Sequence, residues 1–331
     1  MLKTCFAAFF TQALVLTLAP QPVMAQAGSG TPMRTPDGQP DVSGIFTFRT
    51  LTPLERPSQF EGRDSLSAEE AAAFEASERT RQNRDLFDPV TGAPNAGYQP
   101  RAEGGVLSYN EFWYERGIEL TSDKRTSLII DPPNGRRPPR TEAAQVAARE
   151  RRAHTEIHRY DSYENRTMTD RCLGTSVAGP PLRAGAYNNN MMIFQTADHV
   201  VIQNEMASQA RVIPLADTAK PSFAQLKGVS RGHWEGETLV IETTNFRSDS
   251  ALTGPNMHLI ERLTRLDQDT VAYEYTVTDP TVYTAPYTAM IPLRRTDGPI
   301  FEYACHEGNI GLYGILAGAR ELERQGRELR R

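Results

Sequence analysis

The clearest pattern in the chain is a series of short apolar runs that begins after residue 186. The runs are separated by turn signals such as Glu235-Gly236-Glu237. Eight of them are candidate β-strands: Met191–Gln195, Val200–Asn204, Arg211–Ile213, Leu239–Thr243, Leu259–Leu266, Val271–Val277, Thr288–Leu293 and Ile300–Cys305. In the sixth run Tyr273 and Tyr275 point to one face and Glu274 to the other. The predicted fold is therefore mainly β, an antiparallel meander that closes into a lipocalin-like barrel or folds as a sandwich.

The first half of the chain follows a different pattern, with two helices and long loops. Ser67 precedes an alanine-rich run and has Glu70 three residues later, which is the capping-box signature of a helix that runs to about residue 84. A second helix is predicted from Thr141 to about His158, because Thr141 can cap it and most of the residues that follow are good helix formers. Short strands are expected at 45–48 and 126–130.

These patterns divide the chain into three parts. Residues 1–25 are interpreted as a signal peptide. Residues 26–186 are expected to form an extended arm, helices and loops that pack on the barrel. Residues 187–331 are expected to form the antiparallel barrel core and a C-terminal tail.

The signal peptide is predicted from the usual three regions. Lys3 precedes an apolar run, and Val23-Met24-Ala25 resembles a cleavage site. The run is short for a bilayer span, which needs about 20 apolar residues, so a membrane anchor is the weaker reading. We expect a periplasmic or secreted protein that has no membrane association after the signal is cleaved.

Export changes the interpretation of the cysteines. Cleavage would remove Cys5 and leave Cys172 and Cys305 in a compartment where disulfides persist. We predict that these two cysteines pair. The alternatives are two free buried thiols or a metal pair that includes His306.

Charge and motifs restrict the classes of function. The 331 residues carry a formal net charge of -5, which argues against a nucleic-acid partner. The sequence has no glycine-rich phosphate loop, no G-x-S-x-G elbow and no H-E-x-x-H helix, so no cofactor is predicted. His154 and His158 have the spacing of zinc ligands but are interpreted as part of a solvated helix end, and no metal site is predicted.

Several longer segments of the second half resemble a large family of exported bacterial proteins. The segments that carry the resemblance are Tyr187–Asn190, Asp198–Ile202, Ser230–Val240, Thr243–Phe246, Glu261–Arg262 and Phe301–Asn309. They extend over about half of the chain. The resemblance implies export and a shared fold, and it implies no particular reaction.

The candidate catalytic residues lie in the β-rich half. His306 stands beside Glu307 and directly after Cys305, and an imidazole next to a carboxylate can act as a general base near neutral pH. His199 is a second candidate base. Glu261 is the candidate acidic partner and Arg262 the candidate charge stabiliser. Each of these side chains could instead be an ordinary surface or turn residue.

The candidate ligand-binding residues are aromatic or amide side chains near the same strands. Tyr273 and Tyr275 are expected to form a stacking wall, His233 and Trp234 to face the ligand, and Asn189 to donate hydrogen bonds from its amide. The alternatives are a packed pair for His233 and Trp234 and an ordinary loop around Asn189.

These residues support three hypotheses about function. The first is a cofactor-independent periplasmic enzyme of the lyase or isomerase type, which acts by acid/base chemistry on a small hydrophobic or aromatic molecule such as a lignin-derived phenolic dimer. The second is a non-catalytic, lipocalin-like protein that binds a small molecule. The third is a glycan-active hydrolase or lyase with two strand carboxylates. The expected partner is a small molecule, and the oligomeric state is left open.

Overall fold

The computed structural model describes residues 33–83, 111–174, 177–216, 221, 223–248 and 254–327. The predicted signal peptide at 1–25 lies outside them. The strands in these ranges are β1 (Gly44–Thr47), β2 (Ile129–Asp131), β3 (Asn190–Gln195), β4 (His199–Asn204), β5 (Gln209–Pro214), β6 (Val229–Glu235), β7 (Thr238–Thr244), β8 (His258–Arg265), β9 (Thr270–Thr278) and β10 (Tyr287–Arg295). The α-helices are α1 (Ala68–Gln82), α2 (Glu142–His158) and α3 (Ile310–Arg324), and short 3-10 turns occupy 58–60, 111–113, 163–165 and 206–208.

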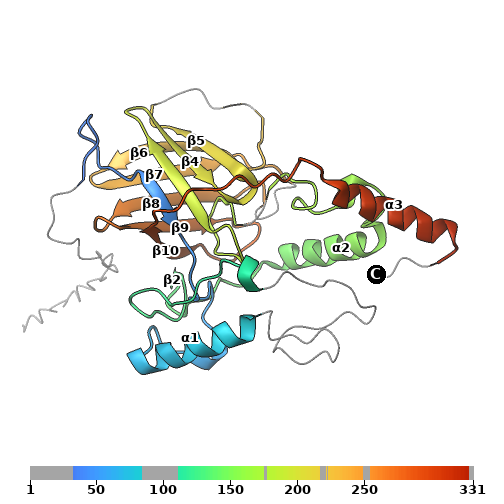
Figure 1. Ribbon diagram of the computed structural model, residues 1–331, viewed down its shortest axis with the longest axis horizontal. Coiled ribbons are helices and arrows are strands. Elements are labelled where there is room, and N and C mark those ends of the chain that lie inside the picture. The colour runs from blue at the N-terminus through green and yellow to red at the C-terminus, as the bar shows by residue number, and fades with distance from the viewer. Residues whose placement is uncertain are drawn as a thin grey trace, which may run out of the picture.

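Nine strands form one antiparallel sheet that curls into a nearly closed barrel (Figure 1). Their order is β5-β4-β3-β1-β10-β9-β8-β7-β6, and β2 pairs with β10 outside this path. The predicted mainly-β, antiparallel barrel is therefore confirmed. The strand from the N-terminal arm, β1, lies between β3 and β10, so it joins the two meanders into one sheet.

The barrel comes close to closing where β5 and β6 approach each other. Gly232 of β6 makes this approach feasible, because a Cβ at this position would lie 2.8 Å from Leu215 and 3.1 Å from Ile213. Arg211 of β5 also reaches Ser230 of β6, at 3.5 Å. Side chains rather than backbone hydrogen bonds thus hold this seam.

The core is built by strict alternation along the strands. In β9 every second side chain is buried, and Val271, Tyr273 and Tyr275 have no exposed area. The residues of β8 and β10 that pair with β9 alternate in the same way. Among them Leu259, Leu263, Ala289 and Leu293 are fully buried. Side chains of this kind fill the interior of the barrel as a packed core.

Most of the predicted strands are confirmed, but one predicted run is not a strand, and one strand and one helix were not predicted. The run Ile300–Cys305 is not a strand. Its backbone binds side chains instead, with Phe301 N donating to Glu205 and Tyr303 N to Ser208. Strand β6 was not predicted, because its sequence is mostly polar or glycine. Helix α3 was also missed, because its glycines lower helix propensity.

The two predicted helices are confirmed with their caps. Ser67 accepts a hydrogen bond from the backbone N–H of Glu70, and the Glu70 carboxylate binds the backbone N–H of Ser67, which completes the capping box of α1. Thr141 caps α2. None of the helices in the described ranges has the length and apolar character needed to cross a bilayer.

Helix α1 lies on the side of the barrel where β2 is found (Figure 1). It is attached by a second, smaller core of Leu51, Leu66, Ala71 and Leu120, which joins the helix to the arm and not to the barrel itself. This arrangement leaves space between α1, the arm and one end of the barrel.

The C-terminal segment is held by a disulfide and by polar contacts. Cys172 and Cys305 are bonded, with their Cα atoms 5.6 Å apart, as predicted. Beyond the disulfide, Arg320 of α3 donates to the backbone oxygens of Tyr160 and Asp161, directly after α2. Helices α2 and α3 therefore lie side by side at the edge of the barrel (Figure 1).

Candidate functional site

A cleft of about 510 Å³ opens between the arm and the end of the barrel that faces α1. Residues 50–54, the last turn of α1, residues 116–117 and the loop 182–186 form its walls, and Leu128, Tyr275 and Ile291 also line it. The volume lies within the range of about 300 to 1,000 Å³ that is usual for small-molecule sites. Segments far apart in the sequence thus meet around a space that could hold a small ligand.

The floor of the cleft is apolar except for one hydroxyl. Tyr275 is fully buried, and its Oη has no hydrogen-bond partner among the described residues. Burial, together with the nearby Tyr287 hydroxyl, raises the pKa of Tyr275, so the phenol stays neutral and can donate a hydrogen bond. Leu128, Leu182 and Ile291 supply apolar surface beside it. A buried hydroxyl without a partner is costly, and its position on a cleft floor suggests an external partner.

Three arginines and one carboxylate line the cleft. Arg81 forms an ion pair with Glu78, with an N–O distance of 2.6 Å. Arg116 lies 3.9 Å from Glu111, and its guanidinium stacks 3.8 Å from the ring centre of Tyr114. Arg183 forms no ion pair with any residue that the structure describes, and its buried Nε lacks a partner. The cleft is therefore positive, and Arg183 is its uncompensated cation.

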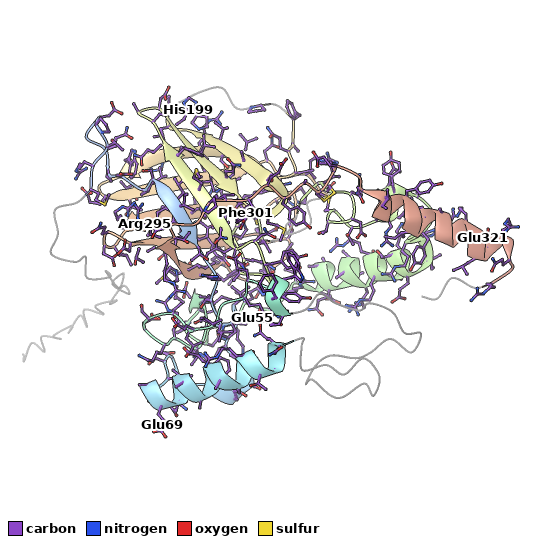
Figure 2. The ribbon with its side chains drawn as sticks, viewed as in Figure 1. Glu55, Glu69, His199, Arg295, Phe301 and Glu321 are labelled. Carbon is purple, nitrogen blue, oxygen red and sulfur yellow. A yellow bond between two sulfur atoms is a disulfide. The ribbon has the colours of Figure 1, made fainter. Side chains whose placement is uncertain are left out.

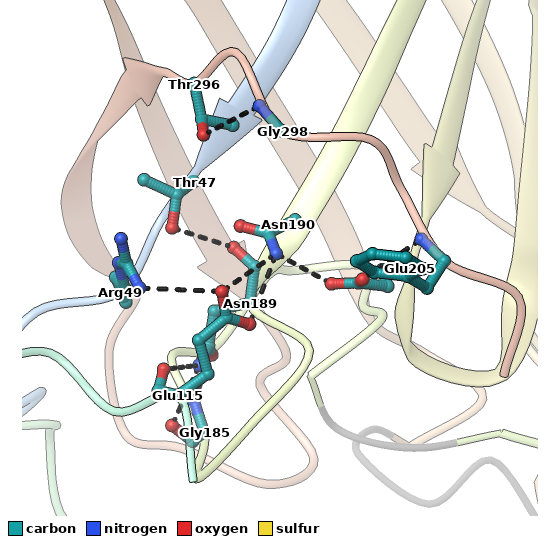
Figure 3. A network of polar contacts seen from close by, with 10 residues as sticks. Thr47, Arg49, Glu115, Gly185, Asn189, Asn190, Glu205, Thr296 and Gly298 are labelled. Carbon is teal, nitrogen blue, oxygen red and sulfur yellow. Dashed lines mark hydrogen bonds and ion pairs between the residues drawn. The ribbon is translucent and has the colours of Figure 1, made fainter. Parts of the chain in front are cut away.

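A polar network fixes the loop that carries Arg183 (Figure 3). The side chain of Asn189 accepts from Gly185 N at 2.7 Å and donates to Gly185 O at 3.1 Å and to Glu115 O at 2.9 Å. Next to it, the Asn190 amide donates to the carboxylates of Glu115 and Glu205. Both polar atoms of the Asn189 amide are therefore hydrogen-bonded within the protein, and these bonds hold the cleft wall in place.

A second polar cluster lies inside the barrel. Arg211 of β5 and Glu261 of β8 form a two-pronged ion pair with N–O distances of 2.5 and 2.8 Å, and Glu261 is fully buried. The hydroxyl of Tyr273 donates to Glu261 at 2.7 Å and accepts from Leu182 N at 3.1 Å. Burial and the Glu261 carboxylate raise the pKa of Tyr273. This hydrogen bond to Leu182 links the buried ion pair to the wall of the cleft.

Lys227 adds another charge near this cluster. It is half-buried at the start of the β6 hairpin. Burial, helped by the positive charge of Arg211, lowers the pKa of Lys227 to about 7. Its ammonium form is thus unfavourable in the folded protein at neutral pH.

We expect Lys227→Met to stabilise the protein more at pH 6 than at pH 10. An unfolded lysine holds its proton up to a pH of about 10.4, whereas folded Lys227 releases it near pH 7. Below pH 7 both states are protonated and the cost of the buried charge is fully present. Stability contributed by this group therefore rises as the pH increases from 7 to about 10. Urea unfolding of both proteins at the two pH values measures the difference, and an equal gain at both would contradict the prediction.

The predicted catalytic residues do not come together. His199 pairs with Asp198 at the hairpin between β3 and β4, His258 pairs with Glu242 on the outer face, and His306 is exposed beside the disulfide. Figure 2 shows His199 far from Glu55, which lies between the barrel and α1. Glu261 faces the barrel interior, whereas Arg262 points outward to Glu235. Alternation along β8 places these two neighbours on opposite faces of the sheet, so they do not form one site.

The predicted ligand-binding residues are also divided. Tyr275 lines the cleft, whereas Tyr273 is enclosed in the barrel and occupied by Glu261 and Leu182. His233 is exposed and pairs with Glu235, and Trp234 packs on the core while its Nε1–H donates to Gln39. Within the described ranges, no three His, Cys, Asp or Glu side chains gather as a metal site.

Sequence reasoning missed Arg183, Arg116 and Arg81. Arginine is common along this chain, so none of the three stands out locally. The sequence offered one signal for Arg183. It directly follows Gly179-Pro180-Pro181-Leu182, a stretch that cannot form a helix and therefore places Arg183 on a loop. Comparison with protein-family models, with curated proteins and with solved structures finds no match.

Proposed function

We propose that this protein binds a small amphipathic molecule in the cleft between the arm and the barrel, and that it does so in the periplasm or outside the cell. The observation that carries the proposal is that Tyr275 lines the cleft and that its buried hydroxyl has no partner within the described part of the chain. The cleft combines an apolar floor with polar and charged walls, and an amphipathic ligand could contact both. Export is supported by the disulfide, because such bonds persist in oxidising compartments.

Binding fits the geometry better than the two enzymatic hypotheses. Acid/base catalysis requires a base within hydrogen-bond reach of the substrate, and none of the six histidines lines the cleft. Glycan cleavage in the usual form requires two carboxylates across the bond. Among the described residues only Glu78 brings a carboxylate to the cleft, and Arg81 engages it. The barrel therefore acts as a rigid support for a binding site at one of its ends.

Tyr275→Phe tests this proposal, because it is expected to have opposite effects on stability and on binding. Removal of an unpartnered buried hydroxyl should raise the free energy of unfolding by about 1 kcal/mol. The same change should weaken binding of a probe that accepts a hydrogen bond, by about fivefold. We suggest 1-naphthoic acid and its methyl ester as probes, with affinity measured by titration calorimetry and stability by urea unfolding.

Tyr273→Phe is the matched control, since it removes the hydroxyl of the adjacent inward-facing tyrosine. That hydroxyl is fully used by Glu261 and Leu182. Its loss should lower the free energy of unfolding by about 1 to 3 kcal/mol. If Tyr275→Phe destabilises the protein as Tyr273→Phe does, the proposed site is wrong.

A further inference from the structure

Arg183 gives the cleft a chemical preference that its shape alone does not. The residue is half-buried in the loop 182–186, its Nε has no hydrogen-bond partner, and no acidic side chain among the described residues neutralises it. The other two arginines of the cleft have carboxylate neighbours. A partly buried cation without a counter-ion is unfavourable unless a ligand supplies one.

Arg183 and Tyr275 line the same cleft, Arg183 from the loop 182–186 and Tyr275 from the floor. The Nε of Arg183 and the hydroxyl of Tyr275 are buried donors without a partner among the described residues. One acceptor group could therefore take hydrogen bonds from both Arg183 and Tyr275.

We infer that the ligand is a small hydrophobic or aromatic carboxylic acid, whose carboxylate binds Arg183 and Tyr275 while its apolar body lies against Leu128, Leu182 and Ile291. This inference rests on the proposed binding function. A carboxylate has enough lone pairs to accept from a guanidinium N–H and from a phenol at once, and its charge compensates Arg183. A neutral ester or amide accepts hydrogen bonds but leaves the cation uncompensated.

The loop geometry supports this assignment because it holds Arg183 in place before a ligand arrives. Asn189 binds both backbone groups of Gly185, two residues beyond Arg183, and Leu182 on its other side binds Tyr273. The backbone on both sides of Arg183 is therefore held before a ligand arrives, and a preordered loop loses less conformational freedom on binding, which favours affinity.

The test compares each of three acids, benzoic, 1-naphthoic and decanoic acid, with its own methyl ester by titration calorimetry. At least one acid should bind the unaltered protein about tenfold more tightly than its ester, which is the effect of one charge-assisted hydrogen bond. Arg183→Gln should remove that preference. Arg136→Gln, at an exposed arginine away from the cleft, should keep the preference.

The outcomes separate this inference from the function on which it rests. Equal binding of acid and ester, or a preference that survives in Arg183→Gln, would overturn the carboxylic-acid assignment and leave small-molecule binding intact. Absence of binding for all six probes would overturn both. If Arg183→Gln does not fold, Arg183→Lys keeps the charge and removes the Nε–H, and it should bind the acid more weakly while still preferring it to the ester.

Discussion

Replacement of Glu261 by glutamine is expected to lower the free energy of unfolding by about 3 to 5 kcal/mol. Glu261 is fully buried, and it is the partner of both guanidinium prongs of Arg211. Burial opposes the charge on Arg211, but the attraction and hydrogen bonds of Glu261 outweigh it and raise the pKa of Arg211. The substitution therefore leaves a buried cation without its counter-ion. Urea unfolding at neutral pH measures the loss.

Two further variants make this result interpretable. Glu242→Gln removes a carboxylate from a pair with His258 on the outer face, where both side chains are 42% exposed, and it should cost at most about 1 kcal/mol. Arg211→Met combined with Glu261→Gln removes both charges and should recover much of the stability lost in the single variant. A loss below about 1 kcal/mol for Glu261→Gln alone would show that the ion pair does not hold the barrel seam.

Removal of the disulfide by a Cys172→Ser, Cys305→Ser double substitution should destabilise the protein by about 4 to 5 kcal/mol. The two cysteines are 133 residues apart, and in the chain-entropy model a bond that closes a loop of this length restricts the unfolded chain strongly. For a chain of this size the melting temperature should fall by roughly 10 °C. Thermal unfolding followed by circular dichroism measures the shift.

The double-serine variant also provides the control for reduction. A reductant should lower the melting temperature of the unaltered protein by a similar amount and should leave that of the variant unchanged. If reduction does not alter the melting temperature of the unaltered protein, the disulfide contributes nothing to stability. Because Cys305 precedes α3, the loss should also release this helix from its place beside α2, which hydrogen exchange would detect.

Much of the fold could be predicted because its signals are local. Alternation in β9, the capping box at Ser67 and the cap at Thr141 each depend on residues within one turn or one strand. The signals failed where local propensity was weak. Glycines concealed α3, polar residues concealed β6, and an apolar run at 300–305 turned out to bind side chains instead of a neighbouring strand.

The candidate site was predicted less well, and β8 shows why. Glu261 and Arg262 are neighbours in sequence and were assigned to one site, yet a strand sends consecutive side chains to opposite faces. The alternation could be read from the sequence. The sequence did not show which face of the strand would lie inside the barrel, or which distant residue would lie opposite Glu261. Arg211 meets Glu261 only because the sheet curls until β5 approaches β8 across the interior.

By itself, the sequence determined that this chain is mainly β, where most strands and two helices lie, and which two cysteines pair, since these depend on residue periodicity, local caps and residue type. Only the tertiary structure decided where a ligand could bind. The cleft joins residues from Thr50 to Ile291, and Arg183 and Tyr275, whose buried donors have no partner in the part of the chain that the structure describes, come from a loop and from a distant strand. Contacts between such distant segments are set by how the sheet closes and how the arm packs on it, and these have no local signature in the chain.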